Sequence, residues 1–127
     1  MEESCWLVLV VDDDPAALAA LGALLEAKGL AVSLAENADG AIACLEDEPL
    51  PDAIVTDLDM PGRSGEEFLA LVRANPRWRS LPVVAMSGCS RLLQGLDGGA
   101  DAKLGKPIDP VALMDALATA RAARVRR

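Results

Sequence analysis

Short apolar runs alternate with helix signals along this chain, and the alternation limits the folds open to it. The first run, Trp6-Leu-Val-Leu-Val-Val11, is continuous and rich in β-branched residues, which is typical of a strand buried on both faces of a parallel sheet. Four further runs, at residues 31–35, 53–56, 82–86 and 102–105, give the other expected strands.

Helix-starting signals follow four of these strands. Asp14 and Asp109 each cap a helix that begins at a proline, Asn37 caps another, and Ser64 forms a capping box with Glu67. A short helix is expected at residues 92–96. The residues expected on the buried faces of the longer helices are Leu18, Leu21 and Leu25; Ile42 and Leu45; Phe68, Leu71 and Val72; and Val111, Met114 and Leu117.

This order of elements predicts an α/β fold of the (βα)5 type. Alternating strands and helices imply a doubly wound, five-stranded parallel sheet with right-handed crossovers and helices on both faces. The strand order 2-1-3-4-5, which is flavodoxin-like, is common for such a sheet. The chain has 127 residues, about one domain, so we expect a single domain over residues 1–127.

Composition excludes several classes of function. A net charge of −8 argues against direct binding to nucleic acid, and the absence of histidine excludes a histidine-based catalytic site. Three cysteines without a CxxC spacing support neither a disulfide framework nor a zinc site, and we expect packing residues, with exposure as the alternative for Cys89. The longest apolar run near the start is too short for membrane insertion or a signal peptide, so we expect a cytoplasmic protein.

Acidic residues gather after the first and third strands, where the expected strand order reverses. Asp12, Asp13 and Asp14 follow the first strand, while Asp57 and Asp59 follow the third. Ligands bind at this position in doubly wound sheets. Asp14 is expected to serve as the helix cap, whereas the others are candidate site residues.

A hydroxyl and an ammonium are expected at the same edge, because Ser87 ends the fourth strand and Lys106 follows the fifth. Crowded carboxylates repel one another unless a cation is present. Asp12, Asp13 and Asp57 together with Lys106 carry a formal charge that one Mg²⁺ ion neutralises, and Mg²⁺ commonly joins carboxylates to a substrate phosphate. The pattern therefore predicts Mg²⁺ and phosphoryl transfer.

The ordered motifs resemble the receiver domain of two-component response regulators, the CheY-like superfamily, over nearly the whole chain. The matching segments are Val10-Val-Asp-Asp-Asp-Pro15, Asp57-Leu-Asp-Met-Pro-Gly62 with Gly65, Ser87-Gly88, Gly99-Ala-Asp101 and Lys106-Pro107. The resemblance implies phosphorelay signalling in which a histidine kinase or histidine phosphotransfer protein is the partner. It implies no enzyme activity beyond self-phosphorylation and self-dephosphorylation, and a monomer or weak dimer.

Site roles follow from the resemblance, position by position. Asp57 would accept the phosphoryl group as an aspartyl phosphate. Asp13, Asp57 and the backbone carbonyl of Asp59 would hold Mg²⁺, with Asp12 helping through water. The Lys106 ammonium and the Ser87 hydroxyl would contact the phosphoryl group, and Gly88 would leave room for it.

Two features depart from the family pattern. Lys103 stands where receivers usually carry an aromatic residue, and the interval from Ser87 to Lys106 is several residues shorter than usual. We therefore expect a shortened region around the fourth helix and an altered readout. The positions that tune phosphoryl lifetime carry Asp59 and Cys89.

Two alternative functions stay open on the sequence. One is a docking module that no longer accepts phosphate, which the Lys103 substitution and the short interval favour. The other is a phosphatase of the haloacid-dehalogenase type, because Asp57-Leu-Asp59 also resembles the DxD motif of that family. The early acidic pair and the short chain argue against the phosphatase. The unterminated last helix favours a domain excised from a longer protein over a stand-alone receiver.

The two tryptophans and the arginines near the end of the sequence carry structural expectations. Trp6 and Trp78 are expected to begin the first and fourth strands, at the sheet edge opposite the acidic residues. The arginines from Arg121 onward are expected to be a solvated helix end, favoured by the helix dipole.

Overall fold

The computed structural model describes residues 6–47, 49–60, 62, 64–95 and 99–125. Its strands are β1 (Leu7–Val11), β2 (Ala31–Ala35), β3 (Ala53–Asp57), β4 (Val83–Ser87) and β5 (Ala102–Gly105). Its helices are α1 (Pro15–Ala27), α2 (Ala38–Glu46), α3 (Gly65–Ala74), α4 (Ser90–Gly95) and α5 (Pro110–Val125). The predicted alternation of strands and helices is confirmed.

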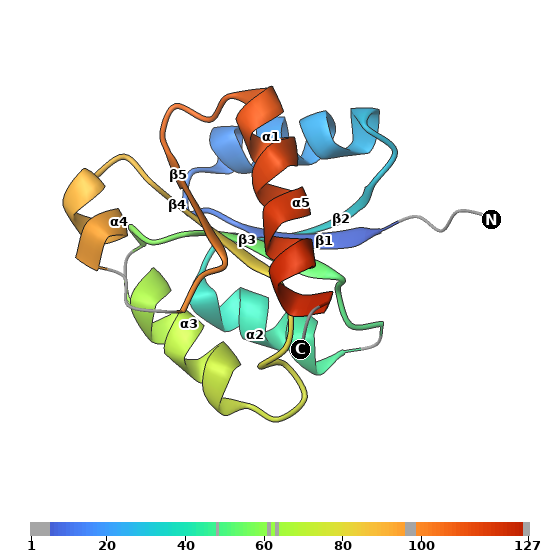
Figure 1. Ribbon diagram of the computed structural model, residues 1–127, viewed down its shortest axis with the longest axis vertical. Coiled ribbons are helices and arrows are strands. Elements are labelled where there is room, and N and C mark those ends of the chain that lie inside the picture. The colour runs from blue at the N-terminus through green and yellow to red at the C-terminus, as the bar shows by residue number, and fades with distance from the viewer. Residues whose placement is uncertain (1–5, 48, 61, 63, 96–98, 126–127) are drawn as a thin grey trace.

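The five strands form one parallel sheet in the order β2-β1-β3-β4-β5, as predicted (Figure 1). The register pairs Val11 with Thr56 and Ser87 with Gly105, so the carboxyl ends of neighbouring strands lie at one edge. Backbone bonds extend the pairing beyond the strands, because the Leu58 N–H donates to the Met86 carbonyl at 2.9 Å. Residues at the carboxyl ends of β1, β3 and β5 are thereby brought together.

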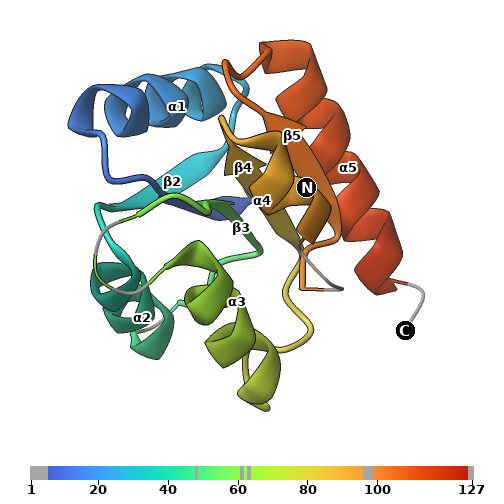
Figure 2. The ribbon, with the colours of Figure 1, turned by 90° about the vertical axis from the view of Figure 1, so that its left-hand side faces the viewer.

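Helices cover both faces of the sheet and enclose two apolar cores (Figure 2). Helices α1 and α5 lie on one side, where leucines of α1 and α5 pack on Val8, Val10 and Val55. Helices α2 and α3 lie on the other side and pack on Leu9, Val11 and other strand residues whose side chains point to that face. Strands buried on both faces explain the nearly continuous apolar runs in the sequence.

The predicted helix caps are confirmed. The Asp14 side chain accepts a hydrogen bond from the Ala16 N–H, and the Asn37 side chain accepts one from the Gly40 N–H. Ser64 and Glu67 form the reciprocal capping box. The carboxylate of Asp109 accepts from the Ala112 N–H at 2.9 Å. After α1 the backbone of Gly29 has φ +89°, which is a conformation that favours glycine at a helix end.

The expectation that Leu71 and Val111 are buried was wrong. Leu71 is 37% exposed, and Leu69, at 2%, is buried in its place. Leu71 lies about 120° around the helix from Gly65, which is also buried, so it falls on the flank. In α5, Val111 is 67% exposed because it lies about 180° around from Ala120, which faces the sheet.

Other expected packing residues lie at the margins of the helix faces. Met114 and Ile42 are half-buried. The buried residues of α2 are Ala38, Ala41 and Leu45, and those of α5 are Leu113, Ala116, Leu117 and Ala120. The buried stripes of α2 and α5 are therefore shifted from those that the apolar spacing indicated, whereas the predicted burial of Leu18, Leu21 and Leu25 in α1 is confirmed.

The region around α4 is short, as predicted. The helix has six residues and begins at Ser90, two residues earlier than expected, while residue 96 lies outside the described residues. None of its residues is buried, although Leu92 and Leu93 pack partly against the core. Trp78 was wrongly expected to begin a strand: it lies in the turn between α3 and β4 and is buried there.

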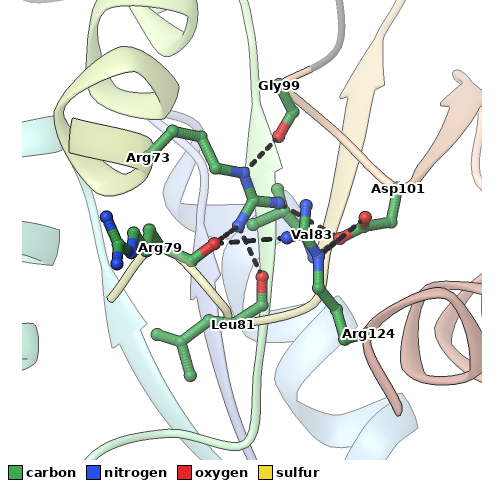
Figure 3. Close-up of polar contacts among 7 residues, drawn as sticks. All are labelled: Arg73, Arg79, Leu81, Val83, Gly99, Asp101 and Arg124. Atoms are coloured by element: carbon green, nitrogen blue, oxygen red, sulfur yellow. Dashed lines mark hydrogen bonds and ion pairs between the residues drawn. The ribbon is translucent and has the colours of Figure 1, made fainter. Parts of the chain in front are cut away.

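An ion-pair cluster joins α3 and α5 through Asp101, the residue before β5, at the amino ends of β4 and β5 (Figure 3). The Asp101 carboxylate contacts Arg73 Nη2 at 3.1 Å and Arg124 Nε at 2.9 Å, and it accepts the Val83 N–H. Arg73 also donates to the backbone carbonyls of Arg79, Leu81 and Gly99. We call Arg73, Asp101 and Arg124 the arginine–aspartate cluster.

The expected solvation of the last helical turn is wrong for Arg124, whose side chain is 11% exposed in this cluster. Arg121 is exposed, and its guanidinium lies 4.7 Å from the centre of the Trp6 ring. Arg126 and Arg127 lie outside the described residues. Within the described residues, every helix is too short or too polar to cross a membrane.

Candidate functional site

The candidate site begins where β1 and β3 end side by side. Asp12 directly follows β1, and its N–H donates to the Ala35 carbonyl at 3.1 Å. Asp57 is the last residue of β3. Both carboxylates are buried, with Asp12 at 0% and Asp57 at 2% exposure. Parallel pairing of the central strands therefore places two buried acids next to each other.

Asp12, Asp13 and Asp57 form a carboxylate cluster that fits a divalent cation. One carboxylate oxygen from each lies within 4.8 Å of the others, and Asp13 is exposed while its two neighbours are buried. Such an all-oxygen donor set with an open side matches the preference of Mg²⁺ for a few carboxylates and retained water. The predicted grouping of these three acids is confirmed as a possible metal site.

Lys106 bridges the two buried carboxylates. Its Nζ donates to Asp12 Oδ2 and to Asp57 Oδ2, each at 3.0 Å. Desolvation acts to lower the pKa of Lys106, but the hydrogen bonds and charges of Asp12 and Asp57 outweigh it and raise that pKa. Lys106 therefore stays a cation between the two acids.

The Asp57 carboxylate has a fixed orientation. Its Oδ1 accepts the Asp59 N–H at 3.1 Å, and its Oδ2 faces Lys106. Burial raises the pKa of Asp57, and the Asp59 N–H and Lys106 only partly counter this effect. A buried carboxylate whose charge is incompletely compensated is expected to gain from an added cation.

Ser87 is buried at the end of β4, and its Oγ accepts the Cys89 N–H at 2.9 Å. The hydroxyl proton is left to donate elsewhere. The Lys106 N–H donates to the Ser87 carbonyl at 3.0 Å, which fixes the two residues in register. Cys89 is exposed, Cys44 is half-buried, and Cys5 lies outside the described residues.

A cleft opens above the carboxylates. Its lining residues are Asp12, Asp13, Asp14, Asp57, Asp59, Met60, Gly88 and Lys106, and its volume is about 540 Å³. Asp14 therefore caps helix α1 and also lines the cleft. Met60 was not predicted as a residue of the site. Its position directly after Asp59 in the acidic motif could have indicated it. Ser87 does not line the cleft.

The described residues thus bring together Asp12, Asp13, Asp57 and Lys106, with Asp59 at the rim. Asp59 is exposed, and its backbone N–H donates to Asp57. The roles of the Asp59 carbonyl in metal binding and of Ser87 in phosphoryl binding stay predictions.

Comparisons with known proteins agree on one family. The model of the response regulator receiver domain matches residues 8–118. A 14.6 kDa protein from the sodA1 3′ region of Leptolyngbya boryana is 38% identical over 84% of this chain and 83% of its own length. Response regulator Rre1 of Synechocystis is 38% identical over 81% of this chain, which spans only 46% of that protein.

Solved structures agree with the sequence relatives. The chemotaxis response regulator CheY4 of Vibrio cholerae is 26% identical and superposes with a TM-score of 0.83, covering 92% of this chain and 99% of that chain. Sheet order, acidic cluster and lysine position now coincide with a family match over most of the sequence. The chain therefore belongs to the receiver-domain family of two-component response regulators.

Proposed function

We propose that this chain, as one receiver unit over residues 1–127, accepts a phosphoryl group onto Asp57. The donor is a phosphohistidine on a histidine kinase or a histidine phosphotransfer protein. The observation that carries the proposal is the buried Asp57 carboxylate, 3.0 Å from Lys106 Nζ and beside the acids of Asp12 and Asp13. A nucleophilic carboxylate that is oriented in this way and has an open cleft above it is suited to attack phosphorus.

In the proposed step, an oxygen of the Asp57 carboxylate attacks the phosphorus atom. The bond between phosphorus and the donor histidine nitrogen breaks, and the nitrogen keeps the electron pair. With the other ring nitrogen protonated, the donor leaves as neutral imidazole. The product is an acyl phosphate on Asp57.

Other residues of the site would orient the incoming group. Asp13, Asp57 and the Asp59 carbonyl are the proposed ligands of Mg²⁺, with Asp12 acting through water, and the ion when bound would offset charge on the transferring oxygens. Lys106 would move from the carboxylate to a phosphoryl oxygen, and Ser87 would donate its hydroxyl proton. A Cβ added at Gly88 would meet nothing within 4 Å, which leaves space for the phosphate.

Phosphorylation would also act as a switch. It replaces one carboxylate charge by about two on the phosphate, so the site becomes more negative by about one unit. Ser87 and Lys106 would be drawn inward, and the β4–α4 loop and α4 would follow because none of the described α4 residues is buried. With Lys103 at the usual aromatic position, the readout would differ from that of other receivers.

Intact-mass spectrometry after incubation with acetyl phosphate and Mg²⁺ tests the proposal. We expect one phosphoryl adduct that disappears in the Asp57→Asn variant and when the metal is chelated. Acetyl phosphate replaces the unidentified partner, so the experiment tests the chemistry of the site alone.

A protein that gains no adduct, in an experiment where an established receiver is labelled, would favour the docking module instead. Fast hydrolysis is separated from lack of reaction by beryllofluoride, a stable phosphoryl mimic. Beryllofluoride binding without an adduct indicates rapid loss of phosphate, and absence of both overturns the proposal. Continuous release of phosphate from a phosphate ester would instead support the phosphatase alternative.

A further inference from the structure

We propose that Thr56 and Gly65 are positioning residues that together seat the backbone of Asp57. The inference rests on the proposed function, because it concerns how the phosphoacceptor carboxylate is held. Neither residue lines the cleft. Both act on the peptide group from which the Asp57 side chain projects.

Gly65 lies directly against this backbone. A Cβ added at Gly65 would stand 2.4 Å from the Asp57 carbonyl oxygen and 2.4 Å from Leu58 Cα. Both neighbours are backbone atoms, which cannot rotate away as a side chain can. The Gly65 N–H also donates to the Leu58 carbonyl at 3.2 Å. Helix α3 can therefore start against the end of β3 only because residue 65 has no side chain.

Thr56 holds the same carbonyl by a hydrogen bond. Its side chain is fully buried, and its Oγ1 donates to the Asp57 carbonyl at 3.1 Å. Pairing between β1 and β3 ends at Thr56, so the carbonyl of Asp57 lies one residue beyond that ladder. The Thr56 hydroxyl thus supplies a donor where the sheet no longer does.

A displaced peptide would move the carboxylate. Both Asp57 oxygens are engaged, Oδ1 with the Asp59 N–H and Oδ2 with Lys106, and the metal cluster needs an Asp57 oxygen near those of Asp12 and Asp13. Outer-shell groups that orient a metal ligand typically contribute about 10- to 100-fold to metal affinity. Thr56 and Gly65 are placed to have this effect through the backbone.

The test compares two pairs of variants. Gly65→Ala is matched by Gly22→Ala, another buried helical glycine, where the added Cβ would meet the flexible Leu34 side chain at 3.2 Å. Thr56→Val removes the hydroxyl and keeps the shape, whereas Thr56→Ser keeps the hydroxyl. Three quantities are measured for each: the melting temperature, the Mg²⁺ dissociation constant by calorimetry, and the NMR shift of the Asp59 amide without metal.

We expect Gly65→Ala and Thr56→Val to weaken Mg²⁺ binding by about ten-fold or more, while Gly22→Ala and Thr56→Ser stay within about two-fold of the unmodified chain. In the metal-free protein, the Asp59 amide proton should shift upfield in the first two variants, because its bond to Asp57 Oδ1 lengthens. A merely structural role would lower the melting temperature and leave both of these readouts unchanged.

Unchanged Mg²⁺ affinity and an unmoved Asp59 amide in Gly65→Ala and Thr56→Val would overturn the inference. If Gly65→Ala does not fold, the Thr56 pair decides alone. If the unmodified chain binds no Mg²⁺, the proposed function fails, and the metal-free amide shift still decides whether these residues position Asp57.

Discussion

Lys106 and the acids around it set the charge balance of the site at the scale of single residues. Two buried carboxylates share one ammonium, while Asp13 adds a third, exposed carboxylate to the cluster. Lys106 and a bound cation would both relieve repulsion among the same acids. Each should therefore reduce the stabilisation that the other provides, even if they occupy different positions. Removing Lys106 separates these contributions.

The Lys106→Met variant is expected to lower the free energy of unfolding of the metal-free protein by about 2 kcal/mol, since charged hydrogen bonds to two buried carboxylates are lost. The same variant should bind Mg²⁺ several-fold more tightly, because the cation then relieves more repulsion. Urea unfolding with and without Mg²⁺ measures both. Lys103→Met, an equal charge change at an exposed residue of β5, is the control. Weaker Mg²⁺ binding in Lys106→Met would mean that the lysine mainly orients the carboxylates.

Helix α3 shows at the scale of elements how the sheet selects which apolar residues are buried. Leu69 and Leu71 are chemically identical and two positions apart, yet one lies at 2% exposure and the other at 37%. Periodicity alone did not separate them, because Phe68 and Val72 fit either face. The close approach of Gly65 to the backbone of β3 turns the helix toward the Leu69 side.

Leu69→Ala is therefore expected to lower the free energy of unfolding by about 2 to 5 kcal/mol, as for other fully buried leucines. Leu71→Ala should cost under about 1 kcal/mol, because much of its side chain is already in water. Chemical denaturation of the two variants side by side measures the difference. Equal losses would contradict the helix orientation described above.

The arginine–aspartate cluster belongs to the same scale, because it joins α3 and α5 through one carboxylate, that of Asp101, directly before β5. Its side chains are only 6% to 18% exposed, and the pairs connect positions 23 and 28 residues apart. No local sequence pattern reveals such partners. The cluster could therefore not be predicted from the sequence, and Arg124 was expected to be solvated.

Asp101→Asn should destabilise the fold by about 3 to 5 kcal/mol, since it leaves two mostly buried arginines without their shared counter-charge. Asp109→Ala, which removes only a helix cap, should cost about 1 kcal/mol. Thermal and urea unfolding compare them. A loss in Asp101→Asn no larger than that in Asp109→Ala would show that the carbonyl contacts of Arg73 hold the region without the carboxylate.

Across the whole molecule, the features that repeat along the chain were predictable and those that depend on distant contacts were not. Alternating strand and helix signals predicted a parallel sheet, for which the observed strand order is a common one, and the acidic cluster follows from strand ends that meet at one edge. Residues such as Gly65 and Thr56 were not identified as site supports, because their partners are backbone atoms. The buried faces of the helices were predicted only in part, because the residues at the centre of each face depend on how the helix packs against the sheet.

The polarity of the sheet leads to a last prediction. Trp6 precedes β1 and Trp78 lies in the turn before β4, whereas the carboxylate cluster follows the opposite ends of the strands. A five-residue strand separates the two edges by about 16 Å. Trp6 is moreover covered by Arg121, and Trp78 is buried in the core on the α2–α3 side.

Saturating Mg²⁺ should therefore leave tryptophan fluorescence nearly unchanged while it raises the melting temperature through binding to the folded state. The Asp13→Asn variant, which removes one exposed carboxylate of the cluster, is the control and should lose most of the thermal shift. Fluorescence titration and thermal unfolding of the same samples test both expectations. Strong quenching by Mg²⁺ that persists in Asp13→Asn would point to a cation near a tryptophan, at the edge of the sheet away from Asp57.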